Sequence, residues 1–123
     1  MRNDIREKLG RGENLFGTQT FLGSKEVATI MGGAGYDFVF ICAEHPSYGA
    51  ERVYDLVKYC EAAGTPALVR LPEIDRTFTK KVLDAGVSAV LFPMIHNAEE
   101  AKSVTDMCMY PPHGNADSDL WGQ

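Results

Sequence analysis

Three apolar runs in this chain end at side chains that could carry out chemistry. The first run stops at Glu44 and His45, the second ends about 25 residues later at Arg70, and a third ends in a polar loop at His96. An imidazole can act as a general base near neutral pH. A guanidinium can hold an anion through its fork of N–H donors. This spacing indicates a reaction site that combines a base with an anion-binding group. The residues alone leave an alternative open, in which His45 is a surface or structural histidine and Arg70 forms a structural ion pair.

The apolar runs are the elements that must position these side chains. Short unbroken runs bounded by glycine and polar residues are typical of buried parallel strands. Polar groups at the same end of successive parallel strands converge in space, and ligands of α/β sheets sit at that end. We therefore expect His45 and Arg70 to lie at the same carboxyl edge of adjacent strands, facing a shared cavity.

The rest of the pattern predicts one helix followed by four β-α units. Predicted helices cover residues 1–10, 24–31, 51–62, 78–85 and 97–107, and predicted strands cover residues 16–22, 37–42, 67–71 and 87–94. Ser24 and Asn97 fit helix N-caps, and the glycine cluster at 32–35 is expected to end the second helix. Repeating β-α units imply a parallel sheet with right-handed crossovers.

The repeat length bounds the fold class. Units of about 25–30 residues suit a (β/α)₈ barrel, but such a barrel usually needs about 250 residues. This chain has 123 residues and no low-complexity linker. Two α/β architectures therefore remain open from the residues alone, a half-barrel of four units and a small open sheet of another kind.

Composition excludes several classes of function. The net charge of −5, without a basic patch, argues against nucleic-acid and anionic-membrane partners. No apolar run approaches the roughly 18 residues of a membrane span, and the N-terminus lacks the apolar core of a signal peptide. The three scattered cysteines are interpreted as reduced thiols of a cytoplasmic protein, without zinc-binding spacing.

Several short phrases, taken together, resemble the HpcH/HpaI class II (metal-dependent) pyruvate aldolase family in order and spacing over residues about 16–114. They are Gly17-Thr18, Gly33-Ala34-Gly35-Tyr36-Asp37-Phe38, Glu44-His45, Val69-Arg70, Asp84-Ala85-Gly86, Pro93-Met94, Asn97-Ala98-Glu99-Glu100-Ala101 and Tyr110-Pro111-Pro112-His113-Gly114. The resemblance implies a TIM-type (β/α)₈ barrel, of which this chain holds about the first four β-α units. It also implies an aldehyde-lyase, a carbon-carbon lyase that cleaves 4-hydroxy-2-oxo acids to pyruvate and an aldehyde through a metal-stabilised enolate.

The resemblance assigns roles to three residues. His45 matches the catalytic base, Arg70 matches the residue that binds substrate and stabilises the enolate, and Asp84 matches the aspartate that raises the basicity of the histidine. Retro-aldol cleavage needs a base for the hydroxyl proton and cationic groups where enolate charge develops. The complete family enzyme uses a divalent metal, Mg²⁺, Mn²⁺ or Co²⁺, and is a homo-oligomer. Its metal ligands lie on later strands, so no metal ligand is expected in this chain.

The roles of Asp84 and Glu44 leave alternatives open. Asp84 falls near the end of a predicted helix that descends from the catalytic face, and eight helical residues span about 12 Å. Either the predicted boundaries are wrong, or Asp84 reaches His45 from a neighbouring subunit, or it only caps the turn at Gly86. The role of Glu44 is also open, because it could pair within its loop or orient a neighbouring group.

The chain departs from the family pattern in two places. Cys42 stands where the family often has Asp, and residues 115–123 do not continue the family sequence. We therefore divide the chain into an N-terminal half-barrel, residues 1–114, and a divergent tail, residues 115–123. This division favours a second class of function, a catalytically inactive or partner-dependent half-barrel.

A half-barrel has physical consequences for the isolated chain. Four strands cannot close a barrel of eight, so the first and fourth strands leave open edges. The inner face should then expose Phe, Val and Leu side chains to solvent. We expect the 123-residue chain to self-associate and to have negligible aldolase activity.

Overall fold

The computed structural model describes residues 4–110 and 112–114, in which strands and helices alternate. The strands are β1 (Gly17–Thr20), β2 (Phe38–Cys42), β3 (Ala67–Arg70) and β4 (Ala89–Leu91). The helices are α1 (Asp4–Gly10), α2 (Lys25–Gly33), α3 (Ala50–Ala62), α4 (Arg76–Asp84) and α5 (Ala98–Cys108). The predicted order of one helix and four β-α units is confirmed.

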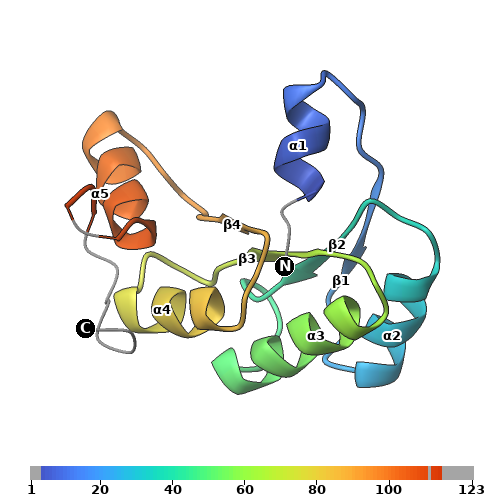
Figure 1. The fold of residues 1–123 in the computed structure, drawn as a ribbon. Coiled ribbons are helices and arrows are strands. Elements are labelled where there is room, and N and C mark those ends of the chain that lie inside the picture. The colour runs from blue at the N-terminus through green and yellow to red at the C-terminus, as the bar shows by residue number, and fades with distance from the viewer. Residues whose placement is uncertain (1–3, 111, 115–123) are drawn as a thin grey trace, which may run out of the picture.

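The strands form one parallel sheet in the order β1-β2-β3-β4, as predicted. Helices α2, α3 and α4 lie on one side of the sheet, and α1 lies on the other side (Figure 1). Helix α5 follows β4 and packs beside α4. The helix layer therefore covers one face of the sheet and leaves most of the other face without a layer of its own.

The core lies between the sheet and the helix layer. Alternate strand residues point into it, because side chains of a strand alternate between its two faces. The fully buried strand side chains Val39, Ile41 and Val69 pack against Val53 and Leu56 of α3. On the opposite face, the strands carry Phe38, Phe40, Leu68 and Leu91, which remain half-buried or exposed. The predicted exposure of the inner face is thus found for Phe and Leu, but the expectation for Val is wrong because these valines face the helices.

Side-chain caps fix where the helices begin. Ser24 Oγ accepts a hydrogen bond from Val27 N at 3.2 Å, and Asn97 Oδ1 accepts one from Glu100 N at 2.8 Å, so both predicted N-caps are confirmed. Asp75 also caps a helix, because its carboxylate accepts hydrogen bonds from Thr77 N at 3.0 Å and from Phe78 N at 3.1 Å. This unpredicted cap starts α4 at Arg76, two residues before the predicted start.

Other predicted boundaries were also wrong, including the end of β1, which stops at Thr20 and not at Leu22. Helix α2 does not stop at the start of the glycine cluster but continues through Gly32 and Gly33, and the chain turns away at Gly35, which has φ 86°. Strand β4 is three residues long and does not reach the predicted end at Met94. Pro93 has no N–H to donate to a neighbouring strand, and Met94 has φ 57°, so neither continues an extended ladder.

Gly32 is required by a close helix–helix contact. A Cβ atom at this position would lie 2.8 Å from Ala63 Cβ and 3.2 Å from the carbonyl oxygen of Cys60. The Gly32 carbonyl also accepts a hydrogen bond from Thr65 Oγ1 at 2.5 Å. Helix α2 therefore approaches the end of α3 more closely than any residue with a side chain would allow.

Replacing Gly32 should separate these two helices. We expect Gly32→Ala to lower the free energy of unfolding by about 1–3 kcal/mol, because the added methyl group overpacks the contact. Gly33→Ala is the matched control, since a Cβ there meets nothing within 4 Å and alanine favours a helix. Urea unfolding followed by circular dichroism measures both variants, and equal effects would contradict this account of the contact.

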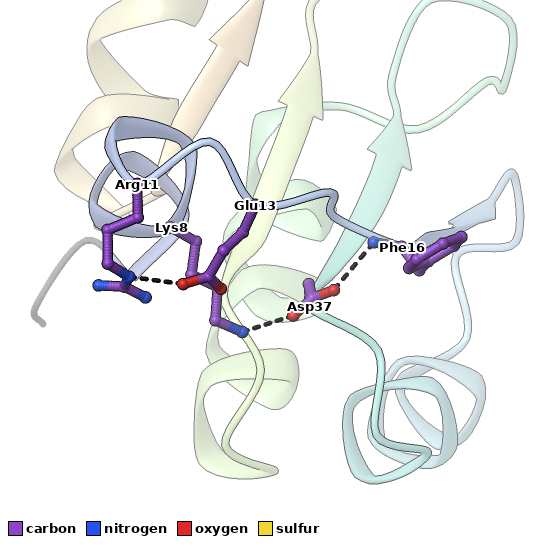
Figure 2. Close-up of polar contacts among 5 residues, drawn as sticks. All are labelled: Lys8, Arg11, Glu13, Phe16 and Asp37. Carbon is purple, nitrogen blue, oxygen red and sulfur yellow. Dashed lines mark hydrogen bonds and ion pairs between the residues drawn. The ribbon is translucent and has the colours of Figure 1, made fainter.

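Helix α1 is tied to the amino edge of the sheet through Asp37. Lys8 Nζ lies 2.5 Å from Asp37 Oδ1, and Phe16 N donates to Asp37 Oδ2 at 2.9 Å, while Arg11 pairs with Glu13 nearby (Figure 2). The Lys8 hydrogen bond, followed by that from Phe16, lowers the pKa of Asp37 from 3.8. The carboxylate form of Asp37 is therefore the form that holds α1.

The docking of α1 should depend on pH in the acid range. Because the pKa of Asp37 is lowered in the folded state, its contribution is complete above the ordinary carboxyl range and is lost as pH falls through the lowered value. We expect the amide NMR signals of Lys8 and Phe16 to shift during acid titration below about pH 4. Asp37→Asn should reproduce those shifts at neutral pH. Signals that stay unchanged in both experiments would contradict the proposed link.

Candidate active site

The sheet register brings the ends of β2 and β3 together. Cys42 is the register partner of Arg70, and Ala43 N donates to the Arg70 carbonyl oxygen at 2.9 Å. The pairing therefore continues to the last residue before Glu44. As a result, Glu44 and His45 leave the sheet directly beside Arg70, at its carboxyl edge.

Three side chains at this edge contact one another. Arg70 Nη2 lies 3.2 Å from His45 Nε2, and Glu44 Oε2 pairs with the Arg70 guanidinium and lies 3.4 Å from His45 Nε2. Glu44 is 17% exposed and Arg70 is 27% exposed, whereas His45 is 61% exposed. We call these three residues the edge cluster. The prediction that His45 and Arg70 lie at the same edge of adjacent strands is confirmed, and the shared cavity stays a prediction.

The contact with Arg70 fixes the tautomer of a neutral His45. A guanidinium can only donate, so Arg70 donates to the neutral imidazole at Nε2, which places the ring proton on Nδ1. After Nε2 takes up a proton, Glu44 Oε2 is close enough to become its partner. The neutral ring therefore has a hydrogen-bond donor beside Nε2, and the protonated ring has an acceptor there. The ring is exposed, so it can also reach a ligand.

Glu44 is the residue at this edge whose role the sequence left open. Its carboxylate pairs with Arg70 of β3 and also lies near His45 of its own loop, so the structure contains both contacts that the sequence left open. A buried cysteine, Cys42, occupies the register position beside Arg70. The carboxylate that pairs with Arg70 comes from the loop after β2.

Aromatic side chains flank the cluster. The Phe21 ring, which follows β1, lies 6.5 Å from the His45 ring between centroids. Tyr48 Oη donates to the Cys42 carbonyl oxygen at 2.7 Å. Burial raises the pKa of Tyr48 to about 12, so this hydroxyl keeps its proton and supports the loop that carries His45.

The other predicted or candidate site residues lie elsewhere. Asp84 is exposed at the end of α4, and Ser88, four residues later, already donates to Ala67 at the amino end of β3. The predicted end of α4 was therefore close to the observed end at Asp84, and an error in that boundary does not explain the assignment. Asp84 lies toward the edge of the sheet opposite His45. His96 also stands apart, because its N–H and ring both contact Glu100 at the start of α5.

The described residues do not by themselves form a site for the divalent metal of the complete family enzyme. Within residues 4–110 and 112–114, no three or more His, Cys, Asp or Glu side chains gather as metal ligands would. Mg²⁺ and similar hard cations are held by carboxylate oxygens and water. Glu44, the carboxylate in the edge cluster, is already engaged with Arg70. The residues present therefore do not fit the divalent metal that the resemblance implies.

The chain belongs to a known protein family. The sequence profile of the HpcH/HpaI aldolase/citrate lyase family matches residues 20–118. The chain is 30% identical over 112 residues to a hydroxypyruvate/pyruvate aldolase of Roseobacter denitrificans, covering 91% of this chain and 44% of that protein. It is 32% identical over 127 residues to a 4-hydroxy-2-oxovalerate aldolase of Rhodococcus jostii, covering 98% of this chain and 49% of that protein.

Solved structures agree on the fold. The structure superimposes on an HpcH/HpaI aldolase/citrate lyase family protein from Burkholderia cenocepacia J2315 with a TM-score of 0.86 and 28% identity, covering 94% of this chain and 48% of that one. The protein is therefore a partial barrel of the TIM type, and the predicted fold class is confirmed. It spans about half the length of the relatives that it matches.

Among the described residues, no helix is long and apolar enough to cross a membrane.

The division of the chain at Gly114 stays a prediction. Residues 115–123, the predicted divergent tail, lie outside the described residues. The described part of the preceding stretch, His113 and Gly114, forms a turn in which both backbone N–H groups donate to the Tyr110 carbonyl oxygen. The predicted loop is thus present up to the last residue that the structure describes.

The contact between Glu44 and Arg70 should appear as coupling in stability. We expect Glu44→Gln and Arg70→Gln each to lower the free energy of unfolding by about 1–3 kcal/mol, because each leaves a partly buried charge without its partner. The double variant should lose clearly less than the sum of the two. The matched control is Lys102 and Asp106 on α5, 2.7 Å apart, where Lys102 is largely exposed and coupling of about 0.5 kcal/mol or less is expected. Additive losses at Glu44 and Arg70 would show that the contact is not formed.

Proposed function

We propose that this chain supplies the base and the anion-binding group of an aldehyde-lyase that cleaves 4-hydroxy-2-oxo acids to pyruvate and an aldehyde. The main support is the 3.2 Å approach of Arg70 Nη2 to His45 Nε2 at the carboxyl edge of a barrel-family sheet. In barrel enzymes that edge is where catalysis takes place. The family match and the aldolase names of the two relatives support the reaction class.

The edge cluster can perform the steps of a retro-aldol cleavage. When Arg70 turns from the imidazole to the bound substrate, His45 Nε2 is free to take the proton of the C4 hydroxyl. The C3–C4 bond then breaks, the aldehyde leaves, and the electron pair of that bond forms the enolate of pyruvate. Arg70 then stabilises the charge on the enolate oxygen. A proton delivered to C3 converts the enolate to pyruvate, and protonated His45 is a suitable donor. Glu44 keeps the guanidinium in place during these steps.

The remaining groups of the proposal lie outside the cluster. When bound, a divalent metal (Mg²⁺, Mn²⁺ or Co²⁺) would add further stabilisation of the enolate, and we propose that its ligands come from outside the described residues. Asp84 can assist His45 only from a neighbouring subunit, because in its own chain it lies toward the opposite edge. This part of the proposal requires a homo-oligomer.

The site supports the proposed ligands, and the cysteines support the proposed cellular location. A small 2-oxo acid and an aldehyde are the proposed ligands, since the exposed His45 ring and one guanidinium suit a small anionic substrate. The described cysteines are free, and Cys42 and Cys60 are buried. Free buried thiols support the proposed cytoplasmic location.

A second candidate is a catalytically inactive half-barrel, whose edge cluster has no catalytic role even in a complete barrel. Two observations favour it. The chain spans about half the length of its curated relatives, and the described residues provide no metal-ligand cluster. The two candidates differ in whether the edge cluster catalyses once the barrel is complete.

A chimeric enzyme separates these candidates. We expect the 123-residue chain alone to release almost no pyruvate from a 4-hydroxy-2-oxo acid with Mg²⁺ or Mn²⁺. Joined to the C-terminal half of the Rhodococcus jostii relative, it should release pyruvate at a rate that a lactate dehydrogenase coupled assay detects. In that chimera His45→Ala and Arg70→Ala should each reduce kcat by about 10²–10⁴-fold.

His113→Ala is the control, because His113 is exposed in the loop after α5 and is not part of the edge cluster. A folded chimera that lacks activity would reject the lyase and leave the inactive half-barrel. Activity that persists in His45→Ala would reject the assigned base.

A further inference from the structure

Tyr48 ties the loop that carries His45 to the end of β2. The loop runs from Ala43 to Gly49, between β2 and α3. Tyr48 Oη donates a hydrogen bond to the carbonyl oxygen of Cys42, the last residue of β2, at 2.7 Å. Because His45 lies between these two residues in the sequence, this hydrogen bond closes the segment of chain that bears the imidazole.

The carbonyl group that Tyr48 binds lies just past the pairing of β1 with β2. The register of these two strands ends with Thr20 beside Ile41, one residue before Cys42. Cys42 is fully buried, and a buried carbonyl group without a donor costs free energy. The Tyr48 hydroxyl therefore takes the place of a strand N–H at the end of β2.

The Tyr48 ring is held from the side by the loop after β1. A Cβ atom at Gly23 would lie 3.2 Å from Tyr48 Cδ1 and 3.5 Å from Tyr48 Cε1, so the ring packs directly against the Gly23 backbone. Gly23 is itself fixed, because Leu22 N donates to Thr20 Oγ1 at 3.0 Å and Ser24 caps α2. The ring also packs against the hydrophobic core. The hydroxyl is thus held in place by parts of the structure outside its own loop.

We propose that Tyr48 is a positioning residue for His45, which keeps Nε2 of the imidazole directed at Arg70 and so selects the neutral tautomer with its proton on Nδ1. The 3.2 Å contact between Arg70 Nη2 and His45 Nε2 forms only while the loop holds the ring beside the end of β3. Tyr48 acts through the backbone of that loop. Residues 43–48 move less freely when both ends of the segment are joined, so the imidazole keeps one orientation.

This tautomer is the one that a base acting at Nε2 requires. An imidazole with its proton on Nδ1 has its free electron pair on Nε2, and a neutral histidine accepts a proton through that pair. The role of Tyr48 in catalysis therefore rests on the proposed function, in which Nε2 takes the substrate proton. The tautomer itself can be measured in the 123-residue chain without any reaction.

Nitrogen-15 NMR of the imidazole rings measures the tautomer. The chain has three histidines, and His45→Ala identifies the signals of His45. At about pH 9 ordinary imidazoles are neutral, and burial raises the pKa of Tyr48 to about 12, so its hydroxyl still donates. We expect the Nδ1–H form of His45 to predominate. Tyr48→Phe keeps the ring but removes the hydroxyl, so the ratio of Nδ1–H to Nε2–H should fall by about threefold or more, as expected for the loss of one hydrogen bond.

A second variant disturbs the same contact from the opposite side. Gly23→Ala adds a methyl group that presses on the Tyr48 ring, so it should lower the His45 ratio in the same direction but by less. Its matched control is Gly33→Ala, because a Cβ there meets nothing within 4 Å. The matched control for Tyr48→Phe is Tyr54→Phe, since Tyr54 lies on α3 and is 44% exposed. Both controls should leave the His45 ratio unchanged.

The outcomes decide the proposal. A ratio that falls for His45 in both test variants, and not for His96 or His113, supports the positioning role. An unchanged ratio in Tyr48→Phe overturns it, and so does an unaltered chain in which His45 is mainly in the Nε2–H form. If circular dichroism shows that Tyr48→Phe is unfolded, Gly23→Ala decides alone. A chimera without pyruvate release would reject the proposed reaction and leave these outcomes as they are.

Discussion

The rest of this structure depends on the parallel direction of its four strands. Each strand must return to the start of the sheet before the next begins, and α2, α3 and α4 make these returns on one side. This arrangement buries Val39, Ile41 and Val69 beneath the helices and gathers the strand ends at one edge. The positions of the core, the open face and the edge cluster all follow from that single constraint.

The sequence predicts the elements well where local signals agree. The apolar run of β2 is bounded on both sides by residues that end a strand. Ser24 and Asn97 mark the starts of their helices, because a short polar side chain is typical of an N-cap. Local signals fail where a distant contact decides. Gly32 reads as a helix stop, but it lies within α2 because Ala63 requires a glycine there. β4 is shorter than its apolar run because Pro93 and Met94 turn the backbone away from its neighbour.

The candidate site shows the same division. The approach of His45 to Arg70 could be predicted, because parallel strands bring their carboxyl ends together whatever the details of the loops. The role of Glu44 could not be predicted, since its partner depends on the path of the loop after β2 and on which rotamer reaches the guanidinium. The position of Asp84 could be derived from helix length alone, and α4 carries it toward the opposite edge of the sheet.

The strand order β1-β2-β3-β4 has a consequence for how the chain folds. Every strand pairs with its neighbour in the sequence, so each new pairing closes a short loop through one helix. Closing short loops costs little chain entropy, and folds built from such local contacts form quickly. The sheet can grow by one β-α unit at a time, starting from the packed pair α2 and α3. Chain synthesis from the N-terminus delivers the units in this same order, so each can settle on a finished neighbour before the next has been made.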